Sequence, residues 1–167
     1  VEPWQMGLVE VRGGRLAAVR FESLLRILPD RPFSPHAPGR HARLRRELAV
    51  APTLQELWPT LASWVSGRPL VAHNIGTERS LLRRAAPLHR FGPWVDTLRL
   101  VRLCYPQLAS AALEDVVPAL GLLPVLQGAC PGRGPHDALY DATACALLLL
   151  HFLALPGWEA VDVAALA

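Results

Sequence analysis

The first part of the chain carries loosely alternating apolar residues, a pattern typical of a β-hairpin. Residues 4–11 predict one strand, and residues 16–27 predict the strand that returns. The pair Gly13-Gly14 between them is a strong signal for a tight hairpin turn. The segment 29–38 that follows is rich in proline and is expected to be irregular.

The rest of the chain shows apolar residues at helical spacing, interrupted by two short apolar runs. Thr53 and Glu56 have the spacing of a capping box, so a helix is expected to start there. Asp137 is the expected N-cap of the last helix. The runs at 69–73 and 94–95 predict strands, the first of them buried on both faces. The predicted helices cover 40–48, 53–67, 77–86 with Thr77 as its cap, 97–103, 113–120 and 137–153.

A hairpin followed by alternating helices and short strands predicts the α/β class. We expect a mixed sheet flanked by helices. The chain has 167 residues, of which 51% are hydrophobic, enough for a real core. No linker or change in composition divides it, so residues 1–167 are expected to form a single domain.

Composition excludes several classes of protein. The three cysteines are odd in number, widely spaced and without a CxxC pair, which argues against a disulfide framework and a structural zinc site. A reducing, cytoplasmic location is therefore expected. The longest apolar run, 142–156, is too short to span a bilayer, so no membrane association is expected. All 17 basic residues are arginines, for which a GC-rich gene is a simpler explanation than a polyanionic partner.

A polar segment directly follows the first short apolar strand. In open α/β sheets ligands bind at such strand ends, where the next helix N-terminus favours anions. His73 and Asn74 lie at this point, but taken alone they are equally explained as turn residues. Glu78 falls in the first helical turn, where a surface carboxylate that complements the helix dipole is the simpler interpretation.

A second polar segment surrounds the start of the last helix. His136 lies in the loop before it, and Asp141 lies five residues later, so both can face the same side of the helix start. A carboxylate can bind a hard cation such as Mg²⁺, and a neutral imidazole can take a proton from water. The alternative is a solvated carboxylate and an ordinary loop histidine.

The two segments together resemble motifs of the DEDDh 3′–5′ exonuclease family, which includes the epsilon proofreading subunit of DNA polymerase III. Residues 70–78 are similar to its second motif, an apolar strand followed by His-Asn and then an acidic residue. His136 and Asp141 match its third motif, His followed five residues later by Asp. Further similarity runs through His41, 51–53, 94–98 and 110–122, so that the resemblance covers nearly the whole chain and implies a ribonuclease H-like fold.

The resemblance also implies a chemistry. In that family two divalent ions, Mg²⁺ or Mn²⁺, flank the scissile phosphate, and nucleoside monophosphates leave from a 3′ end. His136 would be the general base and Asp141 a metal ligand. Glu78 stands where the family usually has Asp, and it would remain a metal ligand with altered geometry.

The implied substrate is a single-stranded DNA or RNA 3′ end. His73, Asn74 and Arg79 are the residues expected to contact it. Arg79 and Arg83 lie one helical turn apart and could neutralise phosphates, although a solvated helix face explains them equally well.

The first motif of the family, Asp-x-Glu on the first and central strand, does not occur in this sequence. We expect that strand to lie upstream of Val1, in a longer chain, rather than to be absent from the natural protein. The resemblance therefore leaves two functions open. One is a metal-dependent exonuclease, and the other is a catalytically inactive module that binds nucleic acid or a protein. A structural domain without either role would require the motif matches to be accidental.

Overall fold

The protein is described from a computed structural model that places residues 3–31, 43–158 and 160–167. The proline-rich segment 32–38 and His41 lie outside the described residues. The predicted hairpin is present, with strand β1 (Gln5–Arg12) antiparallel to β2 (Arg15–Leu24). Gly13 and Gly14 form its turn with φ of 56° and 72°, a backbone region that glycine enters without steric cost.

A second, smaller sheet pairs β3 (Leu70–Ala72) with β4 (Trp94–Asp96) in parallel, and α3 (Gly76–Ala85) connects them. The polar ends of β3 and β4 therefore lie side by side, as expected for a ligand site in an α/β fold. The other helices are α1 (Arg45–Val50), α2 (Leu54–Val65), α4 (Thr97–Cys104), α5 (Leu113–Ala119), α6 (Leu123–Ala129) and α7 (Ala138–Leu153), with a 3₁₀ turn η1 (Val163–Leu166).

The mixed sheet that we expected is present as two small two-stranded sheets. Within the placed parts of the chain, neither β1 nor β3 has a strand partner on its second edge. The three residues of β3 are consequently only half-buried, and the prediction of a strand buried on both faces is wrong for them. The α/β class and the mixture of small sheets and helices are confirmed.

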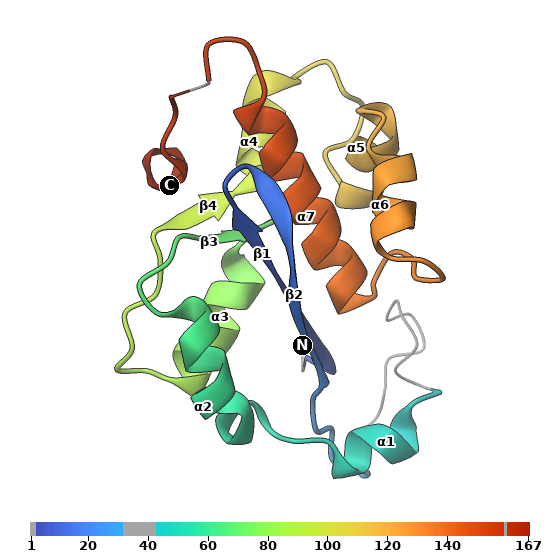
Figure 1. The fold of residues 1–167 in the computed structure, drawn as a ribbon. Helices are drawn as coiled ribbons and strands as arrows, with labels where there is room; N and C mark the ends of the chain where they lie inside the picture. Colours follow the sequence, from blue (N-terminus) through green and yellow to red (C-terminus); the bar gives the residue numbers. More distant parts are fainter. Residues whose placement is uncertain (1–2, 32–42, 159) are drawn as a thin grey trace.

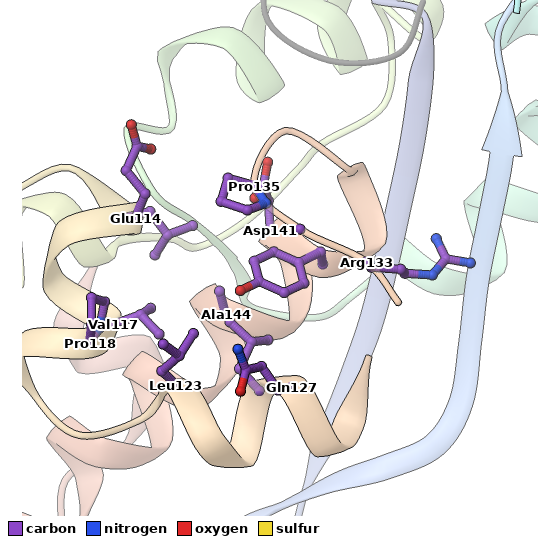
Figure 2. A pocket seen from close by; sticks show the side chains of 13 residues that line it. Glu114, Val117, Pro118, Leu123, Gln127, Arg133, Pro135, Asp141 and Ala144 are labelled. Atoms are coloured by element: carbon purple, nitrogen blue, oxygen red, sulfur yellow. The ribbon is translucent and has the colours of Figure 1, made fainter. Parts of the chain in front are cut away.

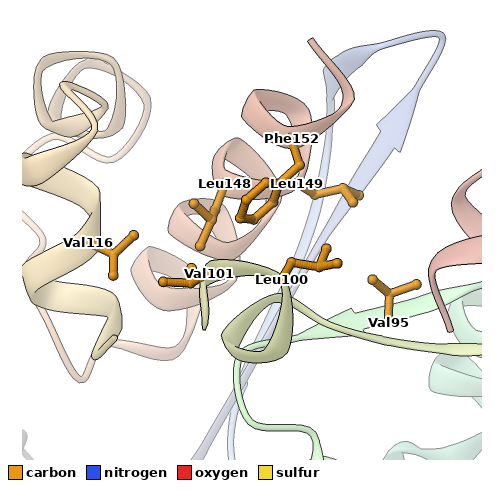
Figure 3. Close-up of a cluster of buried hydrophobic side chains, with 7 residues drawn as sticks. All are labelled: Val95, Leu100, Val101, Val116, Leu148, Leu149 and Phe152. Carbon is orange, nitrogen blue, oxygen red and sulfur yellow. The ribbon is translucent and has the colours of Figure 1, made fainter. Parts of the chain in front are cut away.

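Helix α7 is the central element of the fold (Figure 1). Ten of its 16 residues are buried, because it packs against β1, β2, β3, α4, α5 and α6. Its second half lies in the main hydrophobic cluster, where Leu148, Leu149 and Phe152 meet residues of β4, α4 and α5 (Figure 3). The members of this cluster are Val95, Leu100, Val101, Val116, Leu148, Leu149 and Phe152. No helix among the placed residues is long and apolar enough to cross a membrane.

The hairpin crosses the first turn of α7 at very short range. A Cβ atom added to Gly7 on β1 would lie 2.5 Å from the carbonyl carbon and oxygen of Ala138 and 2.5 Å from the nitrogen of Leu139. All three are backbone atoms, so no side-chain rotation could relieve the overlap. Glycine is needed at position 7 because two backbones meet there.

Most of the predicted helices are confirmed, and two details differ. The capping box of Thr53 and Glu56 is formed, and Asp137 caps α7. Helix α3 begins at Gly76, ahead of Thr77, so the predicted cap is wrong. Helix α6 was not predicted, because its short sequence contains both Pro124 and Gly128.

The close crossing predicts that Gly7→Ala is destabilising. The new methyl group would have to push β1 away from α7, and overpacking of this kind costs about 1–3 kcal/mol of unfolding free energy. Urea unfolding followed by circular dichroism measures the change. Gly128→Ala is the matched control, since nothing lies within 4 Å of its added Cβ, and it should be neutral or slightly stabilising. Equal stability of both variants would contradict the crossing.

Candidate active site

The loop between α6 and α7 holds His136 and Asp141 close together. Asp137 caps the helix by accepting hydrogen bonds from the backbone N–H groups of Leu139 and Tyr140, at 3.2 Å each. The cap fixes the first turn of α7, on which Asp141 lies. His136 has a φ of 67° and an exposed side chain, and its backbone N–H donates to Oδ1 of Asp141 at 3.3 Å. The predicted general base and metal ligand are therefore neighbours in the structure.

Burial perturbs the ionisation of the Asp141 carboxyl group. It raises the pKa of Asp141 from 3.8 to about 6, against the opposing effects of the His136 backbone hydrogen bond and of the His136 charge. The nearby carboxylates of Asp137 and Glu114 raise it further. A carboxylate that is costly to ionise in the free protein gains most from a nearby cation.

The second group of predicted residues lies where β3 meets α3. Asn74 has a φ of 67°, a value that Asn tolerates well, and its backbone N–H donates to Oδ1 of Asp96 at 2.9 Å. Asp96 also caps α4, accepting from the N–H of Leu98 at 3.0 Å. Glu78, in the first turn of α3, has a buried carboxylate oxygen, Oε2, without a hydrogen-bond partner. Burial raises the pKa of Glu78, and the charge of Asp96 adds to this effect.

Both ring nitrogens of His73 make hydrogen bonds. Its Nε2 lies 2.8 Å from the carbonyl oxygen of Ala111, and its Nδ1 lies 3.0 Å from Oγ1 of Thr97. A carbonyl only accepts, so Nε2 carries the hydrogen and Nδ1 is left to accept from the hydroxyl. Burial lowers the pKa of His73, which favours this neutral form. The side chains of Asn74 and Arg79 are exposed, and the nucleic-acid contacts of all three residues stay predictions.

The thiol of Cys145 shows that the two groups of residues approach the same part of α7. Burial raises its pKa to about 12, a hydrogen bond with Thr97 opposes this, and the carboxylates of Glu78, Asp96 and Asp141 each raise it further. These three carboxylates are therefore near enough to this part of α7 to act on the Cys145 thiol. They do not form a finished metal site, since the placed residues contain no group of three or more His, Cys, Asp or Glu side chains that could hold an ion.

Asp96 also lies in this group, although the sequence placed it only within the family-like segment 94–98 and gave it no role of its own. Its carboxylate joins the end of β3 to α4 and adds negative charge beside Glu78. An Asp that directly follows a short apolar strand is the pattern that could have indicated this role.

A cavity of about 290 Å³ adjoins the third-motif residues, between α5, α6 and the start of α7 (Figure 2). Asp141 and Pro135 lie at one side of it, and Glu114 projects from α5 across from them. Its apolar lining comes mainly from α5 and α6, and its charged lining residues are Glu114, Asp141 and Arg133. The lining residues are Leu113, Glu114, Val117, Pro118, Leu123, Leu126, Gln127, Arg133, Gly134, Pro135, Tyr140, Asp141 and Ala144.

The raised pKa of Asp141 predicts how stability depends on pH in the metal-free protein. Between pH 3.8 and about 6 the folded state keeps a proton that the unfolded state releases, so stability should fall as pH rises through this window and then level off. Asp141→Asn removes the titrating group and should flatten this part of the curve. Urea unfolding in EDTA from pH 4 to 7.5 measures both curves. Asp115→Asn, an exposed site on α5, is the control and should keep the slope. A smaller slope should remain in Asp141→Asn, because the raised pKa of Glu78 acts in the same direction; a slope as steep as that of the unsubstituted chain would contradict the assignment.

Comparison with known proteins identifies the family. The model of the RNase T exonuclease family matches residues 1–149. Exodeoxyribonuclease 10 of Escherichia coli (strain K12) is 29% identical over 140 residues, which are 83% of this chain and 57% of that protein. DNA polymerase III PolC-type of Bacillus cereus is 26% identical over 153 residues, 89% of this chain and 10% of that protein. The chain thus spans little more than half of one relative and a tenth of the other, and it belongs to the RNase T/DEDDh exonuclease family.

Proposed function

We propose that the chain is the core of a metal-dependent 3′–5′ exonuclease that releases nucleoside monophosphates from DNA or RNA 3′ ends. Its family membership supports hydrolysis of nucleic acid. The observation that carries the proposal is the pairing of an exposed His136 with a half-buried Asp141 at the start of α7. Two relatives whose names describe DNA enzymes favour DNA as the first substrate to test.

Different residues would accept the proton, position the base and contact the nucleic-acid strand. The imidazole of His136 is open to solvent and can accept the proton of an attacking water. Asp141 accepts from the backbone of His136 and so keeps the base beside the carboxylate. Asn74 and Arg79 lie at the exposed start of α3, where they can contact the sugar-phosphate backbone of the strand.

The carboxylates partly fit the divalent ions that this family uses. Carboxylate oxygens are suitable donors for Mg²⁺ or Mn²⁺, and the unpaired buried Oε2 of Glu78 would gain a partner from a cation. Glu78 and Asp141 alone do not complete a two-ion site among the placed residues. When bound, such ions polarise the phosphoryl oxygen and stabilise the leaving group, and the donors still needed have to come from elsewhere.

We infer that these donors belong to a strand that completes a ribonuclease H-like sheet. Strands β1 and β3 both pack on α7, and each leaves one edge unpaired in the part of the chain that is placed. A strand inserted between them would join the two small sheets into one and would run beside the carboxylates of Glu78 and Asp141. An Asp-x-Glu sequence on that strand would supply the carboxylates that the proposal requires.

The proposal predicts the effect of His136→Ala on nuclease activity. The form to assay has a strand containing Asp-x-Glu joined ahead of Val1, and the substrate is a 5′-labelled single-stranded oligonucleotide with Mg²⁺ or Mn²⁺. Products should shorten one nucleotide at a time from the 3′ end. Removing the general base should lower kcat by about 10²–10⁴-fold.

Two controls accompany this assay. Changing the added Asp and Glu to Ala should abolish cleavage, and EDTA should do the same. Cleavage that persists at the same rate in His136→Ala would refute the proposed role of His136. Parallel DNA and RNA oligonucleotides of one sequence decide between the two substrates.

A second function, binding of nucleic acid without cleavage, is favoured by the incomplete metal site and by Glu78 in place of Asp. Arg79, Arg83 and Arg84 are exposed on α3, next to the proposed site, and provide the positive charge that such binding needs. This function needs neither His136 nor a metal ion, so the two functions can be separated by experiment.

The double variant Arg79→Ala, Arg83→Ala should weaken binding of single-stranded DNA. Each lost phosphate contact should reduce the slope of log affinity against log salt by about 0.7. Fluorescence anisotropy with a labelled oligonucleotide in EDTA, at several salt concentrations, measures this slope. Arg15→Ala, at the exposed hairpin turn, is the control and should leave the slope unchanged. An unchanged slope in the double variant would exclude α3 from the binding surface.

A further inference from the structure

We propose that the β-hairpin positions the third-motif residues, and that Glu22 and Arg133 are the positioning residues through which it acts. The inference rests on the proposed function, because His136 and Asp141 are the groups positioned. The loop from Cys130 to Asp137 joins α6 to α7. Hydrogen bonds and an ion pair connect this loop and its ends to the hairpin.

The main contact is a two-pronged ion pair between β2 and the loop. The two terminal nitrogens of Arg133 donate to the two carboxylate oxygens of Glu22, at 2.6 and 2.7 Å. One of these nitrogens also donates to Asp137, at 2.9 and 3.2 Å from its oxygens. These carboxylates raise the pKa of Arg133 further above its usual value, so the guanidinium group stays charged. Arg133 thus links the hairpin to the residue that caps α7.

Two more contacts fix the ends of the loop. Gln5 on β1 donates from its side chain to Glu22 at 2.8 Å and accepts from the backbone N–H of Ala138 at 3.2 Å. Arg20 on β2 donates to the carbonyl oxygen of Ala129 at 2.7 Å, where α6 ends. The loop is therefore anchored before its first residue, in its middle and directly after its last residue.

The position of His136 depends on these anchors. Its side chain is exposed, and its own backbone is held by the bond to Asp141. Arg133 and Asp137 flank it on the chain, and both belong to the ion-pair network with Glu22. A reacting group displaced by about 1 Å can lose a factor of about 10² in rate. An ion pair of this kind can matter far more for positioning than for overall stability.

The test compares Glu22→Gln with Glu10→Gln. Glu10 lies on β1 of the same hairpin and pairs with Arg12 and Arg68, at 2.8 and 3.0 Å, without touching the loop. Amide hydrogen exchange followed by NMR should become about ten-fold faster at residues 134–141 in Glu22→Gln, from the loss of a charged hydrogen bond. In Glu10→Gln the exchange of these amides should not change.

Further variants separate positioning from general stabilisation. Arg133→Gln should speed the same amides at least as much, because it also removes the bonds to Asp137. Adding Glu22→Gln to Arg133→Gln should change little further, since the ion pair is already lost. Arg133→Lys keeps the charge without the two-pronged geometry and should fall between Arg133→Gln and the unchanged chain. In the nuclease assay Glu22→Gln should lower kcat and leave KM unchanged.

The outcomes distinguish this inference from the proposed function. Unchanged exchange at 134–141, or a nuclease defect confined to KM, would overturn the positioning role. Equal exchange effects of Glu22→Gln and Glu10→Gln would overturn it as well, since they would indicate general loosening of the hairpin. Absence of cleavage by the unsubstituted, strand-completed chain would instead overturn the proposed function, while the exchange result would still decide whether the hairpin holds the loop.

Discussion

The crossing of β1 over the first turn of α7 is the constraint on which the rest of the structure depends. Two backbones approach so closely at Gly7 that a single methyl group would overlap three backbone atoms. Because α7 is also the helix on which β3, α4, α5 and α6 pack, the crossing places the hairpin relative to the whole core. The crossing lies on the first turn of α7, which also carries Asp141. The same backbone contact therefore serves both the packing of the hairpin and the candidate site.

The candidate site places negatively charged groups where burial makes their charge unfavourable. Glu78 and Asp141 are buried enough that their negative charges are costly, and the opposing effect of His136 on Asp141 only partly offsets this cost. Strain of this kind is typical of functional sites, where the surrounding structure compensates for it. Asp141 lies on the first turn of α7, a helix that the core holds in place and that Asp137 caps.

Local sequence signals predicted the parts of the fold that local interactions decide. The capping box at Thr53, the Asp137 cap and the hairpin turn each depend on residues a few positions apart. The start of α3 was misjudged because a contact between Asn74 and Asp96, 22 residues apart, shapes the turn before the helix. The pair of Glu22 and Arg133, 111 residues apart, leaves no pattern in a single sequence. Motif spacing singled out His136, Asp141 and Glu78, whose roles stay predictions, whereas their burial and the pKa shifts of Asp141 and Glu78 could be learned only from the folded chain.

Among the placed residues, β1 and β3 each have one edge without a strand partner, and this has a consequence for the behaviour of the chain at high concentration. An edge strand presents N–H and C=O groups that can pair with a strand of another molecule. β1 is eight residues long, which is ample for such pairing, and its residues are mostly half-buried and apolar rather than charged. The placed part of the chain should therefore self-associate through this edge, and covering the edge would improve solubility.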